Sequence, residues 1–403
     1  MTVLKLTRYE LKKLFVKKSF LLIIAFMILL AFGAYLRPYL TDYKYNFSGI
    51  EGPSDLYSVY GGELTEEKLN TLNSLYNYAS EIKASGVYDP TYNPDKYFGG
   101  YQAIEVYAIL EMCENAERVM AYEDYIKSVK EQTNEFIAEN PNLDGYLKKY
   151  NQMIADTFGD RKLNSISYYD GFLDYDGYFE YKFSIILILL IVVVGVMTIF
   201  TTDTACGCKD YLATALHGSK ITVTSKLIAC AVFMLITMTV FFSADFIYFM
   251  TFERLDGFYQ PLYYLPDFKD TAINITIWQY LILTFAIRFM GFMTIALITA
   301  LVSHITQKPI TSFFITFLSF FGFMFARYLI VAEHLSIFNC FNPVSLLMCH
   351  DMFRGFNVTN VFGTPLHTYI VTLVGVGIIN LILLVLLFIS EGIIAKKGRV
   401  KNA

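Results

Sequence analysis

The sequence predicts an all-α membrane protein with six transmembrane helices, an N-terminal interfacial helix and a mostly helical extracellular domain. Three observations lead to this class. Hydrophobic residues make up 55% of the 403 residues and aromatic residues 17%, which is too apolar for a soluble chain of ordinary architecture. Six apolar segments approach or exceed the roughly 20 residues that cross the hydrocarbon core of a bilayer. Residues 37–182, between the first two of these segments, are polar and acidic.

The spacing of apolar residues places the six transmembrane helices at 19–36, 183–200, 227–250, 277–302, 310–332 and 369–390. Six crossings put both termini on one side. The segments on that side carry 14 Lys and Arg residues, whereas the two short loops opposite carry 3, so we expect cytoplasmic termini in the plasma membrane. Phe20 to Leu36 is long for a signal peptide, and Arg37 follows in place of a cleavage site, so we expect a retained anchor.

Residues 1–18 precede the first span and are predicted to form a cytoplasmic, basic amphipathic helix in the inner membrane interface. Lys and Arg residues occupy much of this helix. Its apolar stripe consists of Leu4, Leu11, Leu14 and Phe15.

Residues 37–182 form the predicted extracellular domain, which carries 25 acidic and 13 basic residues, against 11 and 19 in the rest of the chain. The basic remainder suits an anionic cytoplasmic leaflet, and no pattern typical of nucleic-acid binding is present. Helices are expected at 64–86, where Thr65 precedes acidic residues, at 102–140, which stops before Pro141, and at 141–160. Turn residues predict a loop at 87–101.

The outer loop before the last span contains a segment, residues 338–356, that is too apolar for a free loop and too short to cross the membrane. We expect a re-entrant element or a broken helix packed on the spans. Cys340 and Cys349 lie within it, nine residues apart, and would allow a disulfide in an oxidising compartment.

Three charged residues fall within predicted spans, where ionisable side chains are costly and usually face a partner or a cavity. Asp245 and Arg327 lie at a similar depth below the outer ends of their spans, so we expect them to pair. Arg288 lies deeper and reaches Asp245 or carbonyl groups only through its long side chain. An ion pair that fixes helix packing is favoured over a role in transport.

No enzyme signature emerges from the sequence. Gly218-Ser219-Lys220 lacks the glycine spacing of a phosphate-binding loop, and no His-Glu-x-x-His helix is present to hold a metal. We expect the five histidines to be packed or interfacial. Catalytic and metal-binding residues are therefore not assigned.

The polar segment between the second and third spans is predicted to form a helix over 202–217 that lies along the inner face of the membrane. One side of this helix carries an apolar patch that we expect a partner to cover. Gly218 separates the helix from the start of the next span. A rigid helix joined to two spans transmits force from a docked partner, as a coupling helix does. The candidate coupling residues are Asp203, Gly207, Lys209, Asp210, Tyr211, Leu212, Leu216, Gly218, Lys220 and Lys226.

Together with the N-terminal helix and the Asn-Pro element before the last span, this segment resembles the permease subunits of type-2 ABC exporters. The segment has the form acidic-x3-Gly-x4-Leu, followed by Gly-Ser-basic and a Lys at the next span. The resemblance is carried by Asp203, Gly207, Leu212, Gly218, Ser219, Lys220, Lys226, Asn342 and Pro343. The large outer domain is similar to that of Gram-positive permeases for sodium extrusion, peptide export or resistance to membrane-active peptides.

The resemblance implies a membrane-spanning permease subunit that pairs with an identical or paralogous permease. ATP and Mg²⁺ would be bound by a separate ABC ATPase subunit, and the cargo would be a peptide, drug, lipid or ion. The alternative is a sensor or immunity protein that does not transport and whose extracellular domain binds a ligand.

Overall fold

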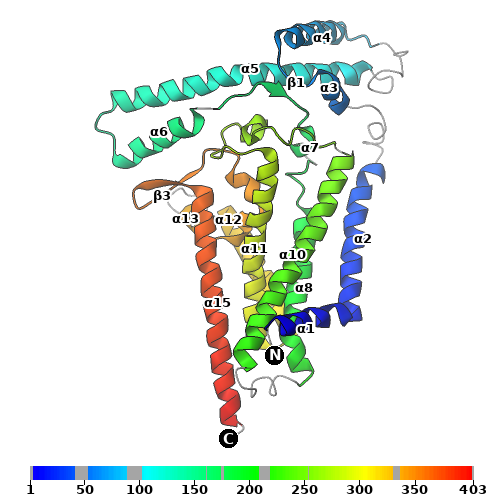
Figure 1. Cartoon of the computed structure of the whole chain (residues 1–403), viewed down its shortest axis with the longest axis vertical. Helices are drawn as coiled ribbons and strands as arrows, with labels where there is room; N and C mark the ends of the chain where they lie inside the picture. Colours follow the sequence, from blue (N-terminus) through cyan, green and yellow to red (C-terminus); the bar gives the residue numbers. More distant parts are fainter. Residues whose placement is uncertain are drawn as a thin grey trace.

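The computed structural model describes residues 3–40, 53–88, 102–159, 161–173, 177–207, 218–252, 254–329 and 336–401 (Figure 1). Within them the chain is mostly helical, with two short antiparallel strand pairs, of which one is a hairpin. The loop predicted at 87–101 lies outside the described residues from 89 onward.

A bundle of long apolar helices forms the body of the protein. Five are long and apolar enough to cross a membrane, and the bent pair α1–α2 brings the number to six if it counts as one span. The all-α class is thus confirmed, and these helices fit a multi-pass membrane protein. The bundle helices are α2 (Lys18–Leu40), α8 (Phe183–Ala205), α10 (Gly218–Phe252), α11 (Ile277–Thr306), α12 (Pro309–Leu329) and α15 (Thr368–Lys401).

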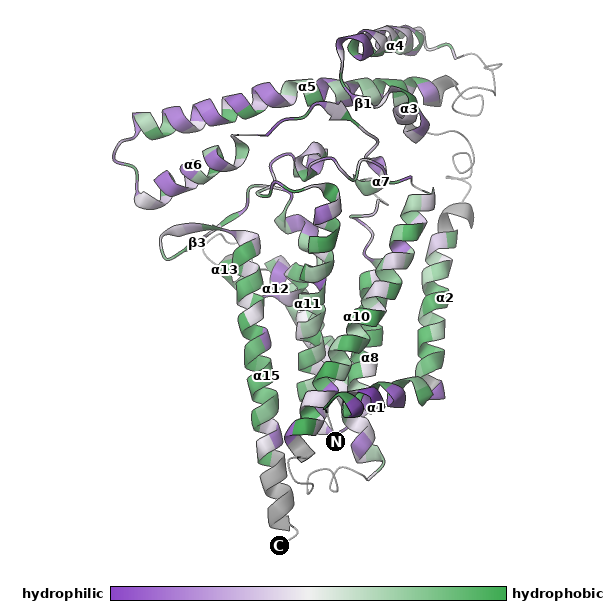
Figure 2. Ribbon diagram, viewed as in Figure 1, coloured by the Kyte–Doolittle hydropathy of each residue, from purple (hydrophilic) through white to green (hydrophobic). Residues whose placement is uncertain are grey.

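Helix α1 (Val3–Val16) and the end of α15 lie at the same end of the bundle, which we call the terminal end; the opposite end is the distal end (Figure 1). Hydrophobic residues cover the middle of the bundle, and polar residues gather beyond both ends (Figure 2). α10 has 35 residues and is therefore about 50 Å long. Since the hydrocarbon core is about 30 Å thick, α10 extends well beyond it.

Helix α8 occupies the centre of the bundle. In the most apolar 18-residue stretch of α8, 72% of the residues are buried, against 17% in the corresponding stretch of α12. Gly195 allows α10 to pack closely, because a Cβ at this position would lie 2.3 Å from the Phe233 ring.

Helix α1 lies across the terminal end at 69° to α2 and packs on α8 and α10 (Figure 1). The predicted apolar stripe is only partly the packed face. Leu14 is fully buried, whereas Leu4 is 83% exposed and Phe15 is 42% exposed. The face that packs on the bundle also contains Thr7 and Glu10, because polar contacts as well as apolar burial hold this helix in place.

A distal domain lies beyond the other end of the bundle, with α5 running across it (Figure 1). The helix predicted at 64–86 is confirmed: Thr65 caps α4 by accepting from the backbone N–H of Lys68, and Gly86 ends the helix with φ 65°. The helices predicted at 102–140 and 141–160 correspond to α5 and α6. The elements are α3 (Pro53–Tyr60), β1 (Gly62–Glu63), α4 (Glu66–Ser85), α5 (Gln102–Glu139), α6 (Gly145–Phe158), β2 (Ser165–Ile166) and α7 (Asp170–Leu173).

The distal domain is fastened to the loop between α10 and α11. The Tyr264 hydroxyl accepts from Asn115 Nδ2 at 2.7 Å and donates to the Ser167 carbonyl at 2.6 Å. Arg161, 3% exposed, donates from Nε to Asn274 Oδ1 at 2.7 Å. One hydrophobic cluster also runs from the domain into the distal end of the bundle. The domain is therefore a packed continuation of the bundle.

The segment predicted at 338–356 is a broken helix packed on the bundle, as expected. It consists of α13 (Ser336–Asn339), α14 (Pro343–Leu347) and a single 3₁₀ turn (Cys349–Met352). Asn342 caps α14 by accepting from Val344 N at 3.0 Å, and its own amide donates to the Phe323 carbonyl at 2.7 Å. The hairpin that follows, β3 (Val358–Val361) with β4 (Thr364–His367), pairs Val358 with His367.

Candidate functional site

The predicted coupling segment lies between the end of α8 and the start of α10. The helix start predicted near Thr202 is wrong, because α8 continues without a break to Ala205. It ends there because Gly207 adopts φ 67°, a left-handed conformation that terminates helices. α10 begins at Gly218, and Lys220 is exposed. Outside the described residues lie the other predicted coupling residues, namely Lys209, Asp210, Tyr211, Leu212 and Leu216.

Four charged residues form a cluster at the terminal end that joins α1, α8 and α10; we call Glu10, Lys13, Asp203 and Lys226 the ionic junction. Asp203 is 2.6 Å from Lys226 Nζ through Oδ2 and 2.8 Å from Lys13 Nζ through Oδ1. Lys13 also contacts Glu10 at 2.8 Å. The side chains of Asp203 and Lys226 are 8% and 7% exposed, so this pair is removed from water.

Hydrogen bonds around the ionic junction tie the same helices together. Lys17 Nζ donates to Thr202 Oγ1 at 2.8 Å. Ser225 Oγ donates to the Val3 carbonyl at 3.3 Å, and Thr7 donates to the Ser225 carbonyl at 3.4 Å. The N-terminal segment is therefore fixed both to the last turn of α8 and to α10.

Sequence reasoning identified Asp203 and Lys226 but missed Glu10 and Lys13 as members of the junction. A signal was present, because Glu10 is the single acidic residue among the first 18. A single carboxylate in a basic helix is expected to pair with a nearby cation. With all four groups ionised, the junction contains two positive and two negative charges, which balance.

The predicted pair of Asp245 with Arg327 is wrong. Asp245 Oδ1 accepts instead from the hydroxyls of Tyr35 at 2.5 Å and Ser184 at 2.7 Å. Similar depth was insufficient, because α2 and α8 surround Asp245 on α10, whereas α12 packs against α8, α11 and α14. Arg327 forms an ion pair with Asp351.

Arg288, in the middle of α11, is held by the broken helix. Its Nε donates to the Leu347 carbonyl at 3.3 Å, which confirms the carbonyl alternative. Its Nη2 lies 2.8 Å from His350 Nε2, and its guanidinium lies 5.2 Å from the centre of the Phe242 ring. Arg288 is 6% exposed.

The contacts of His350 determine its tautomer. Arginine can only donate, so His350 Nε2 must accept from Arg288. The proton of the neutral ring is then on Nδ1, which donates to the Tyr280 hydroxyl at 2.7 Å. Burial, reinforced by the charges of Arg288 and Lys182, lowers the pKa of His350 well below its usual value and keeps the ring neutral. His350 is therefore a packed polar residue, as predicted.

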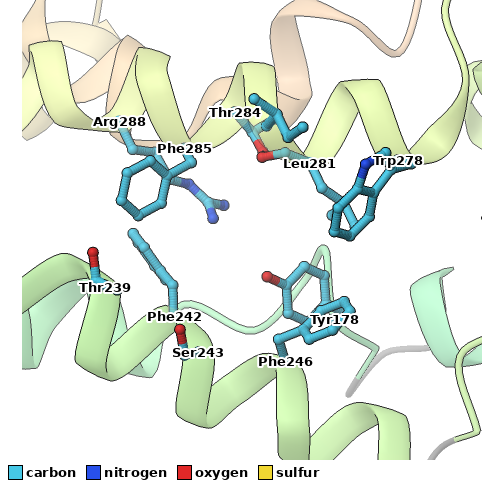
Figure 3. Close-up of a pocket in the computed structure, with 11 residues that line it drawn as sticks. Tyr178, Thr239, Phe242, Ser243, Phe246, Trp278, Leu281, Thr284, Phe285 and Arg288 are labelled. Carbon is cyan, nitrogen blue, oxygen red and sulfur yellow. The ribbon is translucent and has the colours of Figure 1, made fainter.

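A cavity of about 280 Å³ lies between α10 and α11, above Arg288. Figure 3 shows the guanidinium of Arg288 and the hydroxyl of Tyr178 pointing into the same space. The aromatic walls are Phe242 and Phe246 on α10 and Trp278 and Phe285 on α11. Sequence reasoning found Arg288 but not this cavity, because the cavity depends on how two distant helices pack.

The candidate disulfide between Cys340 and Cys349 is absent, because both cysteines are free thiols. Cys340 contacts the Thr359 hydroxyl of the hairpin, with its sulfur 3.8 Å away. Cys349 belongs to the hydrophobic cluster at the distal end of the bundle. The two cysteines thus lie in different packing environments.

Comparison with known proteins gives no match: no protein family, no curated protein and no solved structure is significantly similar to the chain.

Proposed function

We propose that this protein is the membrane-spanning permease subunit of an ATP-driven ABC exporter, with ATP hydrolysis carried out by a separate ATPase subunit. The coupling motif around Asp203 and Lys226 motivates the proposal. The ionic junction is the observation that carries it, because it connects the segment a partner would push on with three helices at once.

The junction gives the proposal a mechanical basis. A force on residues 208–217 acts on the end of α8 and the start of α10, which these residues connect. Asp203 lies two residues before the end of α8, Lys226 is the ninth residue of α10, and the two share one buried ion pair, so the helices cannot separate there without exposing two charges. α1 follows them through Lys13. We propose that an ATPase docked at the terminal end tilts these helices together and so changes access to the transport pathway.

Orientation and partners follow from the same proposal. The terminal end faces the cytoplasm of the plasma membrane, and the distal domain is extracellular. Two permeases, identical or paralogous, pair in the bilayer. The acidic distal domain attracts cations or cationic peptides, or shields the exit.

Copurification tests the proposal directly. The chain is expressed from its native genomic neighbourhood with an affinity tag and purified in mild detergent. Recovery of an ATPase that carries a phosphate-binding loop supports the exporter. Recovery of a kinase, or of the chain alone, contradicts it and favours a sensor that does not transport.

A second experiment tests coupling once an ATPase is in hand. Tyr211→Ala and Leu212→Ala should abolish transport while ATP hydrolysis and the amount of folded protein persist. Lys308→Ala, at an exposed position between α11 and α12 at the same end of the bundle, is the comparison variant for a surface change outside the coupling segment. Unchanged transport in both Tyr211 and Leu212 variants would rule out this segment as the coupling element.

A further inference from the structure

The cavity between α10 and α11 is open toward the surface of the bundle. Trp278 and Ile282, which line it, are 48% and 59% exposed. Both helices are long enough to cross the membrane, so this opening faces the acyl chains of the bilayer. A molecule that is dissolved in the membrane can enter the cavity sideways.

The cavity contains a positive charge whose described contacts are all neutral. Arg288 is bonded to the Leu347 carbonyl and to the unprotonated nitrogen of His350. Asp245, on the neighbouring helix, is near enough to attract Arg288 through space, but it directs Oδ1 to Tyr35 and Ser184 and forms no ion pair with Arg288. Among the described residues, Arg288 forms no ion pair with a carboxylate. A buried cation inside a bilayer is costly and favours a bound anion.

Polar groups in the cavity are few and point to one place. The hydroxyl of Tyr178 faces the guanidinium of Arg288 across the space, and no side-chain hydrogen bond of Tyr178 is found within the described part of the chain (Figure 3). An apolar wall with a few convergent polar groups is the usual form of a small-molecule site. The guanidinium of Arg288 presents its N–H donors in one plane, which suits a carboxylate because a carboxylate accepts hydrogen bonds with both oxygens.

We propose that this cavity binds a long-chain carboxylate, such as a fatty acid, taken from the bilayer. The carboxylate accepts hydrogen bonds from Arg288 and Tyr178, and the chain lies between the aromatic rings toward Ile282. Arg288 is the twelfth residue of α11 and so lies about 16 Å below the start of that helix. A phospholipid would have to pull its whole headgroup to this depth. A fatty acid reaches it because it can enter the hydrocarbon in its neutral form.

The proposal concerns binding by this chain alone and does not rest on the proposed function. The only tryptophan of the sequence, Trp278, lines the cavity, so its fluorescence reports on occupancy. The chain is placed in nanodiscs of zwitterionic lipid at a pH at which the acid is ionised. Dibrominated stearic acid is added as a quencher and compared with its methyl ester at equal mole fraction in the bilayer.

We expect the acid to quench Trp278 at a mole fraction lower than the ester by on the order of tenfold, because only the acid gains charge-assisted hydrogen bonds. Unbrominated stearic acid should reverse this quenching. Equal quenching by the acid and the ester would overturn the proposal.

Variants locate the binding at the cavity. Arg288→Gln should remove the advantage of the acid over the ester, whereas Arg327→Gln, which removes a guanidinium paired outside the cavity with Asp351, should keep it. Because Arg288→Gln also disturbs the contact with His350, Ser243→Phe provides a second test. It fills the cavity from α10 and leaves Arg288 in place. If the acid still quenches Trp278 more strongly than the ester in Ser243→Phe, the proposal is wrong, whether or not the Arg288 variant folds.

Discussion

Removing one member of the ionic junction should destabilise the protein more than removing an exposed charge does. Asp203 and Lys226 are 2.6 Å apart and less than a tenth exposed. Removing one partner of a buried ion pair costs about 3–5 kcal/mol, because the other charge stays buried without compensation. Lys226→Met should fall at the lower end of this range, since Lys13 still neutralises Asp203. Asp203→Asn should fall at the upper end, since Lys226 then keeps no carboxylate among its described ion pairs.

The double variant Asp203→Asn/Lys226→Met distinguishes pairing from general damage. It removes both charges and leaves the Lys13–Glu10 pair intact, so its cost should be smaller than the sum of the single costs by about 2 kcal/mol. Stability is measured by titrating SDS into dodecylmaltoside micelles and following Trp278 fluorescence. The exposed pair Lys162–Glu123, with side chains 76% and 70% exposed, is the matched control and should show a coupling of about 0–1 kcal/mol. Additive costs for Asp203 and Lys226 would refute the reasoning.

Three further predictions use the same titration. Tyr35→Phe removes the 2.5 Å hydrogen bond to Asp245 and should cost about 1.5–3 kcal/mol, whereas Tyr328→Phe, at an exposed position, should cost little; equal effects would contradict the assigned role. Gly195→Leu should destabilise by about 3 kcal/mol or more because its Cβ meets the Phe233 ring, and Phe233→Ala in the same chain should recover part of that loss. Burial raises the pKa of Glu105, so its ionised form destabilises the fold above the unfolded pKa of about 4.3. Glu105→Gln should therefore be more stable than the parent at pH 7, with a difference that shrinks toward pH 4.

Local features of the fold could be predicted from the sequence because they depend on neighbouring residues. Thr65 caps α4 and Gly86 ends it, as their positions around a helical segment indicate. Asn342 and Pro343 start α14 for the same kind of reason. The β3–β4 hairpin was missed, although its turn at Phe362 and Gly363 is only two residues long. A β-branched run with a glycine turn was the signal.

Long-range partners could not be predicted, because they depend on which helices pack side by side. Asp245 binds Tyr35, which lies 210 residues earlier in the chain. Depth alone paired Asp245 with Arg327, but depth does not tell which helices are neighbours. The Arg288 cavity and the α1 contacts of the ionic junction could not be predicted from the sequence for the same reason.

Two polar contacts join α8 to α10, and they are spaced equally along the two helices. Ser184 and Asp203 are nineteen residues apart on α8, and Lys226 and Asp245 are nineteen apart on α10. Ser184 binds Asp245 at one end, and Asp203 binds Lys226 at the other. Nineteen residues of helix span about 29 Å, close to the thickness of the hydrocarbon core. The two polar contacts are therefore separated by about the thickness of the hydrocarbon core, and together they fix the register of the two helices.

Sliding α8 along α10 would break both contacts at once and leave Asp203, Lys226 and Asp245 buried without these partners, which is costly. Tyr35 on α2 joins the distal contact, and Lys13 on α1 joins the terminal one. α1, α2, α8 and α10 should consequently move as one unit. A force applied between α8 and α10 at the terminal end would then act on this unit as a whole, and the Arg288 cavity lies where α10 of this unit borders α11.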